Sequence, residues 1–341
     1  MRRIKALVVG VACLLACGTA PTRAQSPASV PASVDACATR SDILGLSRVV
    51  EVDTAKGPMF GRAPAGEYDF LADREVVLTF DDGPSRSHTP AVLKALDAHC
   101  TKATFFMVGR MAATDPAMVR EVARRGHTVA AHTWSHAKLQ DLELNKAKNE
   151  IEMGFSAVAH AMQGPIAPFF RFPYLRTSKA SIAYLKSRHV ASFGIDVDSR
   201  DFKTRNGAAV KANVLAQLAV RHKGILLFHD IQPSTAHALK DILDALKARG
   251  YNIVHVVPKT SVTTLADYDT LTDREFAHRK LASAKEPLAP RSVVWPQKGT
   301  AKSKGEVLPW TPPAGATRAP TRAKAVRKSE GVSWYEQLLP P

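Results

Sequence analysis

The sequence is poor in cysteine, in acidic residues relative to basic ones, and in long apolar runs. Its 341 residues include four cysteines, and 31 Asp/Glu stand against 47 Lys/Arg. The apolar run at residues 6–17 is too short to span a bilayer, which argues against a transmembrane helix there. No internal repeat is visible, which argues against a repeat architecture. The length suits one large domain or two modest ones.

The first 24 residues have the features of a secretory signal peptide. Arg2, Arg3 and Lys5 precede the apolar run, and a T-R-A cleavage site ends at Ala24. We therefore predict an exported protein, located in the periplasm, in the cell envelope or outside the cell. A buried helix is one alternative. A lipoprotein signal is another, because LLAC is similar to a lipobox and would leave Cys17 as a lipidated N-terminus.

Cleavage after Ala24 would leave Cys37 and Cys100 as the two cysteines of the mature chain. An even pair in an exported protein predicts a disulfide, with two free thiols as the alternative. The bond would tie an N-terminal arm, residues 25–73, to the domain that follows.

Short apolar runs alternate with amphipathic stretches between residues 74 and 258, which is typical of an α/β fold with a parallel sheet, either open or closed into a barrel. We expect residues 259–276 to extend this domain. Seven strands are predicted, at Val76–Phe80, Ala103–Val108, Thr128–His132, Pro168–Phe172, Val190–Ile195, Ile225–His229 and Asn252–Val256.

The stretch 277–341 differs in composition from the rest of the chain. It contains nine of the 22 prolines, and twelve Lys/Arg against four acids, so it carries half of the formal net charge of +16. Such a segment buries too little apolar surface to offset its ordering entropy, so we predict a disordered basic tail. Because the chain is expected to be exported, an anionic envelope polymer or lipid is the predicted partner of this charge, and nucleic acid is not.

Polar clusters follow five of the predicted strands. Because the carboxyl ends of parallel strands meet at one edge of a sheet or barrel, these clusters are expected to converge. They are Asp81 with Asp82, His132 to His136, Arg171 to Tyr174, Asp196 to Phe202, and Leu227 to Asp230.

Two adjacent carboxylates, Asp81 and Asp82, oppose each other's ionisation, so a cation is expected to separate their roles. His132 and His136 are four residues apart, and a helical turn would place both imidazoles on one face. Such a pair alone is more often a surface or capping feature. Beside two carboxylates it favours a catalytic metal site of two histidines and one carboxylate, which leaves a position for water.

The strings TFDDGP, HTWSH, RFPY, DSRDF and LFHD resemble, in order and spacing, the five motifs of the NodB-homology polysaccharide deacetylases, carbohydrate esterase family four. The resemblance covers residues 74–258. It implies a distorted (β/α)7 barrel and a divalent metal, zinc first, with cobalt, nickel or manganese as alternatives. It also implies removal of N-acetyl groups from chitin-like sugars or peptidoglycan, or of O-acetyl groups from xylan.

The same resemblance implies a role for each motif residue. Asp82, His132 and His136 would hold the metal. Asp81 would be the general base, held ionised by Arg171, and His229 the general acid, oriented by Asp201. The Tyr174 backbone N–H would stabilise the oxyanion, and Leu227 and Phe202 would line the acetyl pocket. The family usually has Trp at the position of Phe202, which puts details of that pocket in doubt.

The predicted function is therefore metal-dependent N-deacetylation of a glycan that contains N-acetylglucosamine. An O-acetyl esterase or a small-amide hydrolase of the same family is one alternative. A catalytically inactive glycan-binding protein is another, although neither Asp81 nor His229 is lost.

Overall fold

The computed structural model describes residues 37, 40–62, 66 and 68–285. The predicted signal peptide 1–24, the alternative lipidation site Cys17, the arm residues 25–36 and the tail from residue 286 lie outside the described residues.

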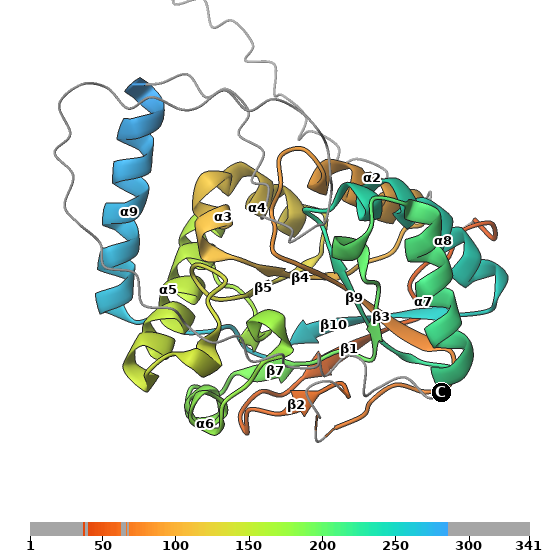
Figure 1. The fold of residues 1–341 in the computed structure, drawn as a ribbon, viewed down its shortest axis with the longest axis horizontal. Helices are drawn as coiled ribbons and strands as arrows, with labels where there is room; N and C mark the ends of the chain where they lie inside the picture. Colours follow the sequence, from red (N-terminus) through yellow and green to blue (C-terminus); the bar gives the residue numbers. More distant parts are fainter. Residues whose placement is uncertain (1–36, 38–39, 63–65, 67, 286–341) are drawn as a thin grey trace, which may run out of the picture. The chain divides into compact units, whose positions relative to one another are not determined.

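Parallel strands form the centre of the fold, and helices pack around them (Figure 1). In the described residues the strands are β1 (Arg48–Val52), β2 (Met59–Phe60), β3 (Glu75–Asp81), β4 (Thr104–Met107), β5 (Thr128–Ala131), β6 (Phe169–Phe170), β7 (Ala191–Phe193), β8 (Val197–Asp198), β9 (Gly224–His229) and β10 (Asn252–Pro258). The helices are α2 (Thr89–Ala98), α3 (Gly109–Thr114), α4 (Pro116–Arg124), α5 (Leu144–Met162), α6 (Lys179–Ser187), α7 (Gly207–Arg221), α8 (Pro233–Ala248) and α9 (Ala266–Lys285), with 3-10 turns η1 (Leu139–Asp141), η2 (Pro173–Leu175) and η3 (Asp201–Lys203).

The predicted α/β fold is confirmed, and each of the seven predicted strands is present. The prediction missed β1, β2 and β8. Two of these are only two residues long, and β1 is largely exposed, so none has the buried apolar run by which a strand is recognised.

The sheet does not close into a barrel through an unbroken hydrogen-bond ladder among the described strands. One ladder runs from β3 through β4, β5 and β6 to β7, and another runs from β3 through β9 to β8. The two ladders meet in one stretch of chain, residues 191–198, whose first half pairs with β6 and whose second half pairs with β9.

Alternation along β3 assigns its side chains to two layers of core. Val76, Leu78 and Phe80 belong to the larger apolar cluster, which also includes residues of the surrounding helices. Val77 belongs to a second cluster made almost entirely of residues from the strands. Because the side-chain period of a strand is two, Thr79 and Asp81 point to the same side of the sheet as Val77. Thr79 and Asp81 therefore extend, toward the carboxyl end of β3, the row of side chains that begins with the apolar Val77.

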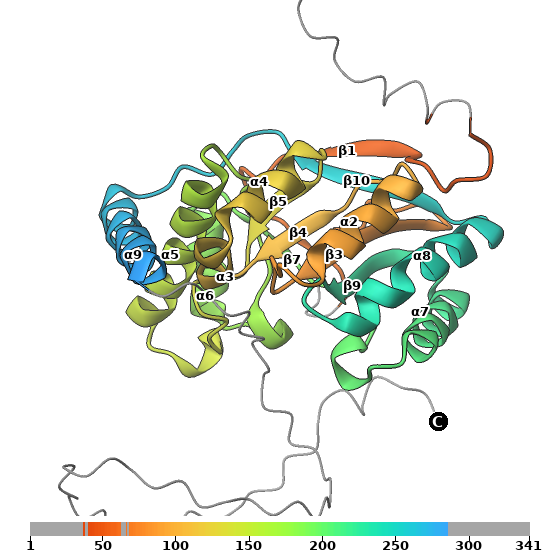
Figure 2. The same cartoon turned by 90° about the horizontal axis from the view of Figure 1, so that it is seen from above.

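Figure 2 shows the helices distributed around the strands, with α7 and α8 beside β9 and with α3, α5 and α9 on the opposite side. Within the described residues, no helix is long and apolar enough to cross a membrane.

The described residues of the N-terminal arm pack against the rest of the fold. β1 pairs in parallel with β10, and β2 pairs with β7. The structure contains the predicted disulfide between Cys37 and Cys100, which joins the arm to the end of α2 across 63 residues of sequence.

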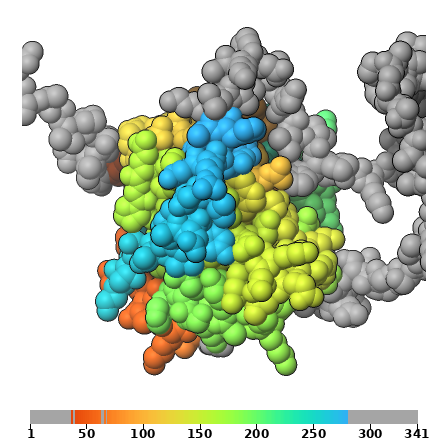
Figure 3. Space-filling view, turned by 90° about the vertical axis from the view of Figure 1, so that its left-hand side faces the viewer, coloured from red at the N-terminus to blue at the C-terminus, as the bar shows by residue number. Residues whose placement is uncertain are grey.

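The predicted start of the tail at residue 277 falls inside α9, because this helix continues to Lys285. Ser156 of α5 donates a hydrogen bond to Asp269 of α9 (2.6 Å), and the rings of His160 and Phe276 lie 4.1 Å apart. Figure 3 shows α9 lying across this face of the molecule beside α5. The composition of the tail as a whole set the predicted boundary, but residues 277–285 contain neither Pro nor Gly and can continue the helix.

Candidate active site

The carboxyl ends of the strands bring the predicted site residues to one edge of the sheet. Asp81, the last residue of β3, pairs with His229, the last residue of β9. Arg171 directly follows β6, and β6 pairs with the end of β5, which His132 follows. The motifs therefore adjoin one another because their strands do.

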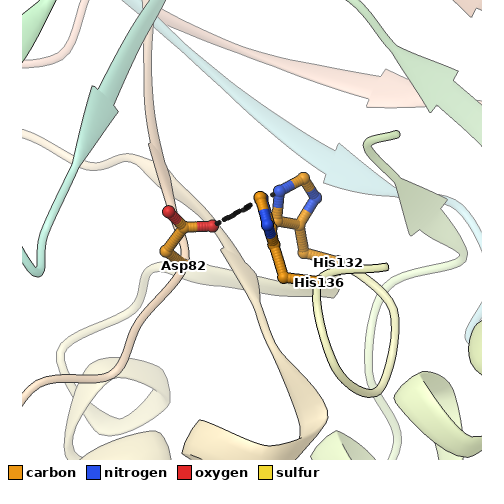
Figure 4. A group of neighbouring side chains, drawn as sticks. All are labelled: Asp82, His132 and His136. Atoms are coloured by element: carbon orange, nitrogen blue, oxygen red, sulfur yellow. Dashed lines mark ion pairs between the residues drawn. The ribbon is translucent and has the colours of Figure 1, made fainter. Parts of the chain in front are cut away.

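Asp82, His132 and His136 form a compact group of metal-binding side chains (Figure 4), with one ligand atom from each within 4.8 Å of the others. Asp82 Oδ1 lies 3.2 Å from His136 Nε2 and 3.5 Å from His132 Nε2. Residues 132–136 do not form the helical turn that the four-residue spacing would allow, but an irregular turn in which Thr133 and His136 have φ of 65° and 61°. The two imidazoles converge through this turn instead.

The chemistry of the three ligands fits a divalent cation. The Nδ1 of His132 lies 2.6 Å from the carbonyl oxygen of Arg171, so we assign its proton there, which leaves the Nε2 lone pair facing Asp82. Burial lowers the pKa of His132 to about 3, so this imidazole is neutral. Asp82 Oδ1 is buried and accepts no hydrogen bond from the described residues. Imidazole nitrogens and a carboxylate oxygen facing one another are a ligand set for zinc and its neighbours in the first transition row.

Asp82 is ionised in this environment. Burial opposes its charge, but the nearby His136 and, after it, His229 hold the pKa of Asp82 below the ordinary value.

Asp81 lies beside this group and is held from the other side. Its Oδ1 accepts a hydrogen bond from Arg171 Nη1 (2.7 Å), whereas its Oδ2 lies 3.9 Å from His132 Nε2. Burial raises the pKa of Asp81 to about 6, although the charges of Arg171 and His229 act against that rise. The two carboxylates thus have different surroundings, because Arg171 bonds to Asp81 whereas the histidines face Asp82.

Arg171 is fully buried, and its guanidinium is fixed on several sides. It donates to the Thr79 hydroxyl (2.7 Å) and to the carbonyl oxygens of Phe193 (3.1 Å) and Gly194 (3.0 Å), besides its bond to Asp81. Its guanidinium carbon lies 4.3 Å from the centre of the Phe106 ring. A buried arginine with this many acceptors holds Asp81 in one orientation.

His229 is oriented by Asp201. Its Nδ1 lies 2.7 Å from Asp201 Oδ1, and its backbone N–H donates to Asp201 Oδ2 (2.7 Å). Burial alone would lower the pKa of His229, but Asp201, and after it Asp82 and Asp81, raise that pKa to about 10. The imidazole is therefore protonated on both nitrogens at neutral pH. Its Nδ1 faces Asp201, so Nε2 is the nitrogen that can donate a proton to another group.

The remaining predicted residues border this network. The Tyr174 ring lies 4.6 Å from the His136 ring, and Tyr174 has a φ of 58°. The Phe202 ring stands edge-on to His229 at 5.5 Å. Leu227 lies two residues before His229 on β9, on the same face, and is buried.

Three further residues support the site and were not assigned a role from the sequence. Thr235 donates to Asp201 Oδ2, and Glu150 bonds to the turn that carries the histidines. Asp230 is buried against Gly83, where an added Cβ would lie 2.2 Å from its carboxylate, so no larger residue fits after Asp82. Asp230 belongs to the LFHD cluster, but Thr235 and Glu150 lie on helices without a motif, and only the fold reveals them.

The parallel α/β fold, with an Asp-His-His group beside an arginine-held aspartate and an aspartate-held histidine, has the architecture of a hydrolase with a candidate metal site. Comparison with known proteins identifies the family. Residues 71–191 match the family described as polysaccharide deacetylase.

A chitooligosaccharide deacetylase from a Bradyrhizobium species is 32% identical over 205 residues, which cover 56% of this chain and 92% of that protein. A peptidoglycan-N-acetylglucosamine deacetylase from Listeria monocytogenes is 34% identical over 184 residues, 54% of this chain but only 38% of its own length. The solved structure of a peptidoglycan deacetylase from Bdellovibrio bacteriovorus has a TM-score of 0.59 and 33% identity, over 65% of this chain and 61% of that one. The chain belongs to the polysaccharide deacetylase family, as the sequence motifs predicted.

Proposed function

We propose that this protein is a metal-dependent hydrolase that removes N-acetyl groups from a glycan containing N-acetylglucosamine, either peptidoglycan or a chitin-like oligosaccharide, and releases acetate. The observation that supports this proposal is that Asp81 and His229, which end the paired strands β3 and β9, lie next to the Asp82–His132–His136 group. A base, a Lewis-acid site and an acid are the three components that amide hydrolysis at neutral pH requires.

In this proposal Asp82, His132 and His136 hold a divalent metal, with zinc as the first choice and cobalt, nickel or manganese as alternatives. When bound, such an ion acidifies a coordinated water and polarises the acetyl carbonyl.

Asp81 accepts the proton of the attacking water. Its pKa of about 6 is close to neutrality, so the carboxylate is ionised at pH 7 and still basic enough to take a proton. Arg171 fixes the carboxylate through Oδ1, which leaves Oδ2 for the water.

His229 donates the proton that the leaving amine needs when the C–N bond breaks. Asp201 holds Nδ1, so the proton on Nε2 is the one available for transfer. The products are then acetate and a free amino sugar.

Tyr174, Phe202 and Leu227 are proposed to contact the acetyl group: the Tyr174 backbone N–H at the developing oxyanion, and the Phe202 and Leu227 side chains around the methyl. Tyr174 lies beside His136 and Phe202 beside His229, so the two aromatic residues border the metal side and the acid side of the site. We further propose that the protein acts outside the cytoplasm, on the basis of its predicted signal peptide, and that its basic tail associates with anionic envelope material.

The test is deacetylation by the purified, zinc-loaded protein. Chitooligosaccharides, peptidoglycan fragments and acetylated xylan are incubated in parallel, and released acetate is measured together with product masses. Loss of acetyl groups from either N-acetylated glycan supports the proposal. Acetate released from xylan alone would make the protein an O-acetyl esterase. No release from any of the three substrates would refute the proposal in favour of a small-amide hydrolase or an inactive glycan-binding protein.

A further inference from the structure

The turn that carries both histidines is held by a carboxylate from outside the predicted motifs. Glu150 lies on α5, fourteen residues after His136. Its Oε2 accepts a hydrogen bond from the Ser135 N–H (2.9 Å), its Oε1 accepts one from the Ser135 hydroxyl (2.8 Å), and its backbone carbonyl accepts one from the Trp134 N–H (2.8 Å). One residue thus binds two successive residues of the turn between the histidines.

The turn needs such support because its backbone is strained. Thr133 and His136 both have positive φ, a conformation that side chains other than glycine adopt only at a cost. Left alone, the turn would relax toward ordinary dihedral angles and carry the His136 imidazole away from Asp82.

Packing beneath the turn works in the same direction. Gly154, one helical turn after Glu150, lies directly under Thr133, where an added Cβ would come within 2.6 Å of the Thr133 carbonyl carbon. The Thr133 hydroxyl also accepts a hydrogen bond from the His136 N–H (3.0 Å). α5 therefore supports the turn from below, and Glu150 supplies the polar contacts of that support.

We propose that Glu150 is a positioning residue for the metal group: it fixes residues 133–136 so that His136 Nε2 meets Asp82 Oδ1, without itself being a ligand. This inference rests on the proposed metal site. Because ligand geometry must be held within about 0.5 Å, loss of an outer hydrogen bond typically weakens metal binding about 10- to 100-fold.

A carboxylate at position 150 matches the two donors of Ser135. Ser135 offers two donors, and both oxygens of Glu150 are used as acceptors. The substitution Glu150→Gln would retain one acceptor, because an amide nitrogen cannot accept, whereas Glu150→Ala would retain only the backbone contact to Trp134.

The experiment measures metal affinity directly. Full-length protein is stripped with a chelator, and the Kd for zinc is determined by competition with a chromophoric chelator for the wild type and for E150A, E150Q, S135A and E143A. Glu143 is the matched control, an exposed glutamate at the start of the same helix whose side chain makes no capping bond. Turnover at saturating zinc and the melting temperature without metal are recorded in parallel.

We expect Kd to rise about 10- to 100-fold in E150A, and less in E150Q and S135A, while E143A binds as the wild type does. Saturating zinc should restore most of the turnover of E150A. An unchanged zinc Kd in E150A would overturn the proposal, whether or not turnover at saturating zinc is lost. If E150A does not fold, the zinc Kd of S135A is the test: an unchanged Kd in S135A would then overturn the proposal. A wild type that binds zinc but deacetylates nothing would refute the proposed function and leave this comparison intact.

Discussion

Two buried histidines outside the active site should make the protein labile to acid. His127 and His255 are each 5% exposed. The Ala103 N–H donates to His127 Nδ1 (3.3 Å), and His255 Nε2 lies 2.9 Å from the Thr128 hydroxyl oxygen. Burial, with the charge of nearby Lys102 as a smaller cause, lowers the pKa of His127 to about 3 and that of His255 to about 4.

The direction of the effect follows from proton linkage. Each folded pKa lies below the unfolded value of about 6.5, so the unfolded chain binds more protons, and stability falls as the pH drops from about 6.5 toward 4. At pH 5 each histidine lowers the free energy of unfolding by about 2 kcal/mol, compared with about 0.2 kcal/mol at pH 7. Together they cost about 4 kcal/mol, a large share of the roughly 5–15 kcal/mol typical of a domain.

The substitution His255→Gln isolates one half of this effect, because glutamine can still donate to Thr128 but does not titrate. Urea unfolding at pH 7 and pH 5, followed by circular dichroism with chelator present to remove any metal contribution, should show a drop about 2 kcal/mol smaller than in the wild type. His278→Gln, at an exposed position on α9, is the control and should leave the drop unchanged. Equal drops in the wild type and His255→Gln would refute the reasoning.

Four other predictions concern the site and the ends of the chain. Asp82→Ala should lose the metal and regain some activity in excess zinc, whereas Asp81→Asn should keep the metal and lose about 10²–10⁴-fold in turnover; the reverse metal contents by elemental analysis would exchange the two roles. His229→Ala should keep the metal and lose more turnover on amides than on an activated ester, whose leaving group needs no proton; equal losses would contradict its role as an acid. Replacing Cys37 and Cys100 together by Ser should lower the free energy of unfolding by about 4 kcal/mol, given the 63-residue separation, and an unchanged urea midpoint would refute this. Truncation after residue 285 should preserve the melting temperature and the turnover of soluble oligosaccharide substrates, but weaken salt-sensitive binding to anionic envelope material. Truncation after residue 276 should lower the melting temperature, because it shortens α9. Equal melting temperatures for the two truncated proteins would contradict the contribution of α9.

The seven buried strands could be predicted because each is a short apolar run, and β3 is buried along its whole length. The arrangement of the site followed from the same pattern, since polar residues that end neighbouring parallel strands must meet. β1 could not be predicted in this way, because Val49 and Glu51 face solvent and its partner β10 lies far along the sequence, with Arg48 paired to Val254.

The features of the site that could not be predicted from the sequence also depend on contacts with distant parts of the chain. The four-residue spacing of His132 and His136 is compatible with a helix, and only the contacts of Glu150 and Gly154 explain the strained turn that forms instead. The bond of Thr235 to Asp201 spans 34 residues and depends on where α8 packs, which no local pattern records.

The pairing of β1 with β10 links processing of the N-terminus to solubility. From Val254 to Pro258, β10 has β1 as its partner, so without β1 a row of backbone donors and acceptors in the segment VHVV, residues 254–257, would face solvent. An apolar, uncharged strand edge of that kind invites pairing with another chain. β1 itself presents Arg48 and Glu51, charges that discourage such pairing. Proteolysis at the predicted site after Ala24 would spare this covering strand. A cut after Val52 would separate β1 from the rest of the chain except for the Cys37–Cys100 bond, so such a cut together with reduction of that bond would release β1 and turn the exposed edge into a template for aggregation.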